Sequence, residues 1–377
     1  MAFHHSDLSD FFPLDFDNVP LSDINRFLQR TTQMSFTVTD LIASDATFGA
    51  TVVDPNLINP WGVSFSATGP FWISENNSGV SSIDSVTASG VKINVIPEVT
   101  IATPPGQTPG TASPTGQVFN SFSATNAFML SDGSPAAFIF ATEDGTISAW
   151  NAKAGTQSIL TVDNSANPAA GDEVAGTGAV YKGLAIAQTA NGPELFAANF
   201  RHGTVDVFDQ NFNLVASFTD PTVPKGFAPF NVQVLNGKLF VAFAKQDATK
   251  HDDTAGAGNG FVDEFNLNGS LVGRIASRGP LDSPWGLAIA PSTFGNLAGD
   301  LLVGNFGSGT IDAYNLTTDQ FDGVLKGTDG KPIVIGDLWA LTPGNGGSAG
   351  STGTIYFTAG VENEAKGLFG SLTVQTA

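Results

Sequence analysis

A strand pattern that returns six times constrains the fold of this 377-residue chain more than any other feature of its sequence. Each copy starts with a small or aromatic residue and an apolar strand, then turns tightly into a second strand that ends in polar residues. A Gly-containing turn and an alternating third strand complete the unit. The copies lie at 59–84, 137–151, 181–209, 228–266, 283–315 and 338–374. This long repeat predicts an all-β fold, a six-bladed β-propeller of four-stranded antiparallel blades.

The two ends of the repeat array indicate how the propeller closes. Only three strands follow in the last copy, whereas 35–43 forms an alternating strand that belongs to no copy. We expect this N-terminal strand to become the outer strand of the last blade, because closure of that kind leaves only short, protected sheet edges. The second copy has the weakest first strand, which we place around Ser121–Leu130. Asp-Gly and Asn-Gly pairs at 132–133, 191–192 and 236–237 favour two-residue hairpin turns between first and second strands.

The chain divides into an N-terminal extension and one domain. Residues 1–34 are acidic, rich in Phe and interrupted by Pro13 and Pro20. They form either a docking arm or propeptide remnant, or a partly disordered extension that lies on the main domain. Residues 35–377 form the propeller.

Composition excludes several classes of function. The net charge of −20 repels nucleic acid and anionic membrane surfaces. No apolar run is long enough to span a bilayer, and the first residues lack a secretory leader, so the chain is cytoplasmic or has lost its leader. The absence of Cys excludes disulfides, zinc thiolate sites and a Cys nucleophile. The sequence has no dinucleotide fingerprint, phosphate loop or nucleophile elbow, so we expect no organic cofactor. We also expect the protein to be a monomer.

The position of the long connections predicts where a site lies. In a four-stranded blade, the second-to-third turn and the link to the next blade emerge on the same face. The long segments that we recognise are all of these two kinds, at 97–118, 164–180, 219–229, 245–259, 276–284 and 326–337. We therefore expect one face to carry the functional loops and the opposite face to be structural.

Polar and aromatic residues at the blade starts and second-strand ends should meet on that face, near the central channel. Such a pocket, with apolar walls and a few convergent polar groups, suits a small-molecule ligand. In the alternative interpretation these residues are ordinary turn chemistry and inter-blade wedges. The candidate substrate-binding residues are Trp61, Asn76, Glu143, Lys182, Asn199, Arg201, Asn231, Lys245, Trp285, Asn305 and Trp339.

An acidic, Gly-rich loop at 244–263 interrupts the repeat and offers the sharpest candidate for a metal site. Its ligand candidates are Asp247, His251, Asp252 and Asp253. Carboxylates and backbone carbonyls favour Ca²⁺ as first choice, whereas a ligating His251 would favour Mn²⁺, Fe²⁺ or Zn²⁺. The alternative is a solvated acidic loop in which His251 pairs with an aspartate.

Several long motifs carry a resemblance to known proteins. They include DPNLINPWGVSFS, FIFATEDGTISAWN, FAANFRHGTVDVFD, AKQDATKHDDTAGAGNGFVDEFN and LLVGNFGSGTIDAYN, and the match runs from Phe36 to Val374. The chain resembles an uncharacterised family of bacterial and fungal six-bladed propellers, whose members often carry export signals. More distantly it is similar to the NHL propellers and to the gluconolactonase and strictosidine synthase group.

The resemblance implies a channel-mouth site and an extracellular or periplasmic location. In the lactonases it also implies a divalent ion held by Glu, Asn and Asp side chains. By blade position alone, the counterparts here are Glu75, Asn199, Asn231 and Asp247. Lys366 departs from the closer family, which commonly has histidine at this position, and this lysine cannot readily serve as a metal ligand.

Two classes of function remain open at the level of sequence. The first is a metal-assisted enzyme acting on a small molecule, either a lactonase-like hydrolase or an isomerase or cyclase. The second is a non-catalytic extracellular ligand-binding or cell-surface module, in which Lys182, Arg201 and Lys245 would favour an anionic group.

Overall fold

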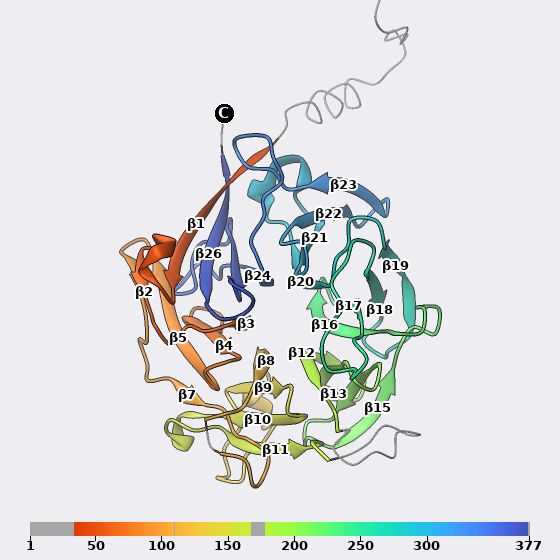
Figure 1. The fold of residues 1–377 in the computed structure, drawn as a ribbon. Helices are drawn as coiled ribbons and strands as arrows, with labels where there is room; N and C mark the ends of the chain where they lie inside the picture. The colour runs from red at the N-terminus through yellow and green to blue at the C-terminus, as the bar shows by residue number, and fades with distance from the viewer. Residues whose placement is uncertain (1–33, 109, 167–177, 376–377) are drawn as a thin grey trace, which may run out of the picture. The chain divides into compact units, whose positions relative to one another are not determined.

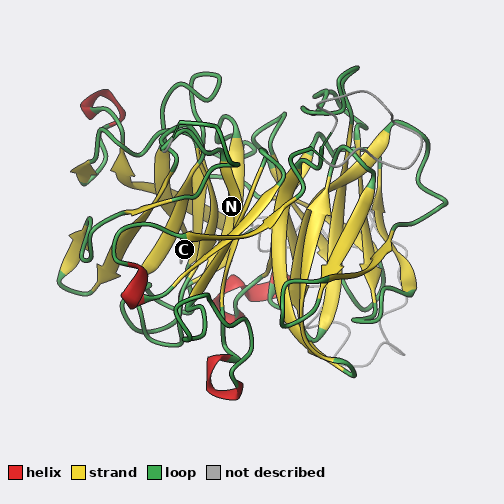
Figure 2. Ribbon diagram, turned by 90° about the horizontal axis from the view of Figure 1, so that it is seen from below, coloured by secondary structure: helices red, strands yellow, loops and turns green. Residues whose placement is uncertain are grey.

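A computed structural model describes residues 34–108, 110–166 and 178–375, and from Ser35 onward the regular secondary structure of the described chain is almost entirely β-strand. Six sheets surround a central channel, and the first strand of each sheet lies innermost (Figure 1). The prediction of a six-bladed propeller with four antiparallel strands per blade is confirmed. The only helices in the described ranges are short 3₁₀ turns, as Figure 2 shows. None of them has the length and apolar character needed to cross a membrane.

The blades follow one another along the chain. Blade 1 contains β3 (Pro60–Ser64), β4 (Phe71–Glu75), β5 (Val80–Thr87) and β6 (Gly90–Lys92), with β7 (Val99–Thr100) also paired to β5. Blade 2 contains β8 (Pro114–Phe119), β9 (Phe138–Thr142), β10 (Thr146–Trp150) and β11 (Ile159–Asp163). Blade 3 contains β12 (Tyr181–Thr189), β13 (Gly192–Asn199), β14 (Thr204–Phe208) and β15 (Leu214–Phe218).

The remaining blades repeat the order. Blade 4 contains β16 (Phe227–Leu235), β17 (Lys238–Lys245), β18 (Gly260–Phe265) and β19 (Leu271–Ser277). Blade 5 contains β20 (Pro284–Ile289), β21 (Leu301–Asn305), β22 (Ile311–Asn315) and β23 (Gln320–Val324). Blade 6 contains β24 (Leu338–Pro343), β25 (Ile355–Ala359) and β26 (Leu368–Gln375). The 3₁₀ turns are η3 (Ala46–Phe48), η4 (Ser123–Thr125), η5 (Ala152–Ala154) and η6 (Ser292–Leu297).

The N-terminal strand closes the ring as expected. β1 (Ser35–Ala43) pairs antiparallel with β26 along its whole length, from Ser35 opposite Gln375 to Ala43 opposite Leu368. The short β2 (Val52–Val53) adds a parallel pairing on the outer side of β1. The last blade is therefore built from both ends of the domain, as Figure 1 shows for the red and dark blue strands.

Glycines let the inner strands approach closely around the channel. A Cβ atom added at Gly62 would lie 2.4 Å from the carbonyl oxygen of Thr115, and one at Gly116 would lie 2.2 Å from the amide nitrogen of Leu184. Both contacts are with backbone of the neighbouring blade, which cannot move aside easily. The Trp-Gly and Thr-Gly pairs at the blade starts thus allow tight inner packing, while the apolar strand faces form the core between blades.

Two sequence expectations about the connections are wrong. The first strand of blade 2 is Pro114–Phe119 rather than 121–130, so Asp132-Gly133 lies within a long connection and not in a two-residue hairpin. Asn236 and Gly237 do form the expected two-residue turn, and both have positive φ. The turn before β13 is also two residues long, but it consists of Ala190 and Asn191, and Gly192 is the first residue of the strand. Long first-to-second connections at 120–137, 290–300 and 344–354 also emerge on the face that we expected to be structural.

Candidate functional site

Aromatic rings fill the channel at the end where the inner strands begin, which we call the mouth. Trp61, Phe200, Phe230, Trp285 and Trp339 form this aromatic plug and are all buried. The rings of Trp61 and Trp339 stack with their centroids 3.5 Å apart, and Trp285 meets both edge-on at 6.0 and 5.8 Å. Three residues that we expected at a binding pocket therefore pack against one another. Aromatic pairs of this kind add stability beyond the area that they bury.

Lys182, at the start of β12, places a buried ammonium group against the plug. Its side chain is 2% exposed, and Nζ lies 5.1 Å from the Trp61 ring centroid. Nζ donates hydrogen bonds to Glu143 Oε1 and, at 3.2 Å, to Asp252 Oδ1. Burial alone would lower the pKa of Lys182, but attraction to the two carboxylates outweighs it and raises this pKa above its usual value. The lysine therefore stays charged.

Two glutamates reach the mouth from other blades. Glu143 follows β9 and accepts a hydrogen bond from Asn76 Nδ2 at 2.9 Å. Glu364 lies in the loop before β26, and its Oε2 accepts from Asn59 Nδ2 at 2.7 Å. Burial, with repulsion from Glu143, raises the pKa of Glu364 to about 7, although Lys182 opposes the rise.

His251 and Asp252 come from the loop between β17 and β18. The His251 Nδ1 lies 3.0 Å from Asp252 Oδ1. This hydrogen bond raises the pKa of His251, and it is also the main reason why the pKa of Asp252 lies well below its usual range. Blades 2, 3, 4 and 6 thus bring together five ionisable side chains, which we call the mouth cluster: Glu143, Lys182, His251, Asp252 and Glu364.

Part of the mouth cluster has the geometry of a metal site. Ligand atoms of Glu143, His251 and Asp252 all lie within 4.8 Å of one another. The structure does not bring the other expected ligands to this trio. Asp247 accepts hydrogen bonds from Thr249 Oγ1 at 2.8 Å and from the His251 amide at 3.0 Å within its own loop. Asp253 is paired with Gln246 in a β-bridge, and its Oδ2 has no hydrogen-bond partner.

Several expected binding residues instead form structural hydrogen bonds within a blade or between neighbouring blades. Asn199 Nδ2 donates to Asp206 Oδ2 at 2.8 Å, and Asn305 Nδ2 donates to Asp312 Oδ2 at 2.9 Å. Asn231 Nδ2 donates to the carbonyl of Trp285 at 2.7 Å. These buried amides pair with neighbouring strands or blades and are satisfied there.

The two remaining cationic candidates, Arg201 and Lys245, have surroundings that differ from those of the buried amides. Arg201 donates to the carbonyl of Gly178 at 2.9 Å, and Lys245 is exposed at the end of β17. The ligand set implied by the lactonases is not assembled either. Each of its four members makes different contacts: Glu75, Asn199, Asn231 and Asp247. Glu75, for example, is buried in blade 1, where the charges of Asp54, Glu98 and Asp84 act on it.

The binding and metal-ligand candidates predicted from the sequence do not include Glu364 and Asn59. Both lie in polar segments at the blade ends, and three consecutive residues from Glu362 to Glu364 have positive φ values between 56° and 65°. Left-handed backbone at three non-glycine residues is rare and marks a tightly constrained loop. The polar run Glu-Asn-Glu at 362–364, just before the last strand, is the sequence feature that indicates a site residue here. The left-handed backbone of this run cannot be deduced from the sequence.

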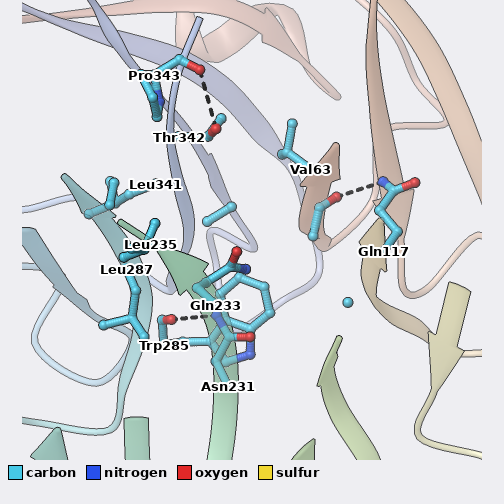
Figure 3. Close-up of a pocket in the computed structure, with 14 residues that line it drawn as sticks. Val63, Gln117, Asn231, Gln233, Leu235, Trp285, Leu287, Leu341, Thr342 and Pro343 are labelled. Carbon is cyan, nitrogen blue, oxygen red and sulfur yellow. Dashed lines mark hydrogen bonds between the residues drawn. The ribbon is translucent and has the colours of Figure 1, made fainter. Parts of the chain in front are cut away.

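A separate small cavity lies farther along the channel. Its free volume is about 60 Å³, enough for a few water molecules but well below the size of typical organic ligand sites. The hydrogen bonds at its wall in Figure 3 include those from Gln117 to the Gly62 carbonyl and from Asn231 to the Trp285 carbonyl. Leu287, Leu341 and Pro343 form much of the apolar lining. This cavity is therefore less suited than the mouth to ligand chemistry.

Comparison with solved structures gives weak likenesses at low sequence identity. A streptogramin B lyase has a TM-score of 0.46 and 11% identity, covering 91% of this chain and 99% of the lyase. A chain of a nidogen/laminin complex has a TM-score of 0.45 and 11% identity, covering 80% of this chain and 85% of that chain.

Sequence comparison gives relatives along nearly the whole chain, although no protein-family model matches it. The uncharacterized protein R648 of Acanthamoeba polyphaga mimivirus is 30% identical over 359 residues, covering 93% of this chain and 83% of R648. The uncharacterized protein L690 of the same virus is 30% identical over 362 residues, covering 93% of this chain and 88% of L690. The chain belongs to the family of the mimivirus proteins R648 and L690.

Proposed function

We propose that the channel mouth is an acid–base active site that acts on a small molecule. The observation that carries the proposal is the mouth cluster itself. Side chains from four blades place a cation, carboxylates and an imidazole in mutual contact or electrostatic range over a rigid aromatic plug. Clusters of ionisable groups with shifted pKa values are characteristic of active sites, although structural ion-pair networks produce them as well.

The residues divide into groups that exchange protons and groups that position them. Glu364, with a pKa of about 7, is suited to accept and return a proton at neutral pH. His251 is the second exchanging group, because Asp252 fixes its ring and raises its pKa. Lys182 holds Glu143 and Asp252 in place and supplies a fixed positive charge. This set supports proton transfer in hydrolysis, elimination or isomerisation.

Titration of Glu364 tests the proposal without knowledge of the substrate. Carbon-13 NMR of glutamate-labelled protein, with the resonance assigned through Glu364→Gln, should give a pKa near 7 for this carboxyl. A value in the ordinary range of about 4 to 5 would remove the proposed proton-exchanging group. Turnover of a panel of chromogenic esters and lactones should then be lost in Glu364→Gln and reduced in His251→Asn.

A divalent ion at Glu143, His251 and Asp252 is the second candidate, favoured by the 4.8 Å spacing of their ligand atoms. Lys182 opposes it, because its ammonium already binds two of the three ligands. An ion here would polarise a bound substrate or water. Elemental analysis and melting with EDTA, Mn²⁺ or Zn²⁺ test this candidate. Asp252→Asn should abolish an ion-dependent shift, whereas the neighbouring Asp253→Asn should retain it.

The geometry gives less support to a non-catalytic site for an anion. Lys182 is the best-placed cation, but its charge is directed to Glu143 and Asp252. An anionic ligand would have to compete with both carboxylates for the same ammonium group. A neutral or weakly basic ligand fits the acidic mouth better.

A further inference from the structure

A groove between the outer parts of blades 3 and 4 is separate from the channel mouth. Its free volume is about 320 Å³, which falls within the usual range of ligand sites. It lies beside the hairpin turns that lead into β13, β15 and β19, and these turns emerge on the face opposite the mouth. We call it the rim groove and define it by six of its lining residues: Asn191, Glu194, Val207, Asp209, Phe218 and Leu267.

Strand register explains the apolar floor of the rim groove. Val207 lies opposite Phe196 on β13, and both belong to the hydrophobic core between blades 3 and 4. Phe218 packs against the same core, and its ring lies 5.1 Å from that of Phe265 in blade 4. A Cβ atom added at Gly269 would lie 2.8 Å from the Phe218 ring, so the turn before β19 packs closely over this residue. The floor is therefore formed before any ligand arrives.

Glu194 places a buried carboxylate at the rim groove. It lies opposite Ala187, a member of the same core, so its side chain is on the face of blade 3 that meets blade 4. Glu194 is 6% exposed. Its Oε1 accepts from Asn191 Nδ2 at 3.3 Å, but no described residue forms a hydrogen bond with Oε2 or an ion pair with this carboxylate. A buried carboxylate without a cation is costly, so a positively charged partner would stabilise it.

Asp209 adds a second negative charge to the rim groove. Its Oδ1 accepts from the backbone amides of Asn211 at 2.8 Å and Asn213 at 2.9 Å, so the turn before β15 fixes the carboxylate in place. These neutral donors leave its charge unbalanced. None of the described residues that line the cavity is basic. The groove therefore favours a ligand with an ammonium or guanidinium group.

The outer edge of β15 borders the rim groove and has no partner strand in the described part of the chain. β15 is the outermost strand of blade 3, as Figure 1 shows, and none of its five residues is charged. Leu214 and Val215 are 55% and 52% exposed. Isolated β-bridges join the rims of blades 1 and 2 and of blades 5 and 6, whereas none links described residues of blades 3 and 4. An edge without charge or Pro is open to pairing with another chain.

We propose that the rim groove binds an extended segment of another protein, which pairs with β15 and places a Lys or Arg side chain against Glu194. The register of β15 shifts at Val215, so the regular part of the edge is Ala216–Phe218. Main-chain hydrogen bonds to this edge would supply affinity, and the acidic cavity would select the basic side chain. The apolar stem of Lys or Arg suits the floor of the groove, while its charged end reaches the carboxylate.

Charge distinguishes this partner from a second copy of the chain. The chain has 35 acidic and 15 basic residues, which give a net charge of −20. Two copies paired through β15 would bring Glu194 and Asp209 of both copies to one interface, where like charges repel. A basic segment would instead be attracted to the acidic surface. The partner that fits the rim groove therefore carries positive charge.

Fluorescence anisotropy of a labelled synthetic heptapeptide with the full chain tests the proposal. The probe alternates Val and Thr and has Lys at its centre, and a second probe has uncharged norleucine in place of Lys. The Lys probe should bind about 10-fold more tightly. Glu194→Gln should remove this difference, whereas Glu264→Gln, a carboxylate of blade 4 beside Lys238, should keep it. No binding of the Lys probe, or equal binding of both probes to the wild type, would overturn the proposal.

Two N-methylated forms of the Lys probe test the strand pairing without any change to the protein. Methyl groups on alternate residues block the main-chain donors along one edge of an extended peptide. Of the probes methylated at odd and at even positions, one should lose binding and the other should keep it. Equal binding of the two would exclude pairing with β15. Sedimentation velocity should find a monomer, and a dimer that dissociates in Val215→Lys would identify a second copy as the occupant instead.

Discussion

Lys182 is the residue on which the mouth depends most strongly. Its ammonium is buried and neutralises Glu143, whose side chain is only 12% exposed. Lys182→Met should lower the free energy of unfolding by about 3 kcal/mol, because it leaves a largely buried carboxylate without its cation. Guanidinium denaturation measures the change. Lys245→Met, at an exposed position on the next blade, should change stability by less than about 0.5 kcal/mol. A Lys182→Met protein as stable as this control would contradict the ion-pair assignment.

The buried carboxyl group of Asp312 should make the protein less stable as the pH rises. Burial raises its pKa from 3.8 to about 6, although the hydrogen bond from Asn305 opposes the rise. The folded protein therefore binds more protons than the unfolded chain between these values, so this contribution to stability is full below about pH 4 and is lost as pH rises through 6. A rise of this size corresponds to a loss of about 3 kcal/mol of stability.

Comparison with an uncharged variant isolates this contribution. The unfolding free energy of the wild type minus that of Asp312→Asn, measured by urea denaturation, should fall between pH 4 and pH 6 and then remain level. A difference that does not vary with pH would show that Asp312 titrates alike in the folded and unfolded chains.

At the level of the secondary-structure elements, the closing strand has the clearest energetic consequence. Phe36 in β1 is 2% exposed, and its ring lies 5.0 Å from that of Phe294 in η6 of blade 5. Phe36→Ala should therefore destabilise the protein by about 3 to 5 kcal/mol. Val38→Ala, at a position that is 37% exposed on the same strand, should cost less than about 1 kcal/mol. Equal effects of the two variants in chemical denaturation would argue against β1 as a packed part of the ring.

Blade 2 shows why one element was misplaced from sequence. Its true first strand, Pro114–Phe119, begins with Pro, Thr and Gly and contains Gln117, so it lacks the apolar pattern of the other inner strands. The apolar run at 127–130 is more strand-like, but it is part of a connection in which Asn126 and Phe128 have positive φ values. Phe128 is nevertheless fully buried and packs against Phe212 of blade 3. Tertiary contacts, not strand pairing, explain its apolar character.

At the scale of the whole molecule, the fold was largely predictable because each repeat must bury its faces against its neighbours. Six copies and one unmatched strand imply six blades closed by that strand, as β1 and β26 confirm. The order of the strands in each blade predicts that the polar residues at the blade starts and second-strand ends lie on one face. Their pairing did not, since Glu143, Lys182 and Asp252 are joined by hydrogen bonds between three different blades. The partners in such contacts depend on loop conformations that local sequence does not encode.

The central claim is that side chains from several blades form one site at the channel mouth. The pKa of Glu364, measured in variants of other blades, tests this claim most directly. The charge of Glu143 in blade 2 raises the pKa of Glu364 in blade 6, and that of Lys182 lowers it. The NMR-measured pKa of Glu364 should therefore fall in Glu143→Gln and rise in Lys182→Met. It should stay unchanged in Glu264→Gln, a carboxylate of blade 4 that lies away from the mouth beside Lys238. A Glu364 pKa that is the same in the wild type and in Glu143→Gln would contradict the shared site.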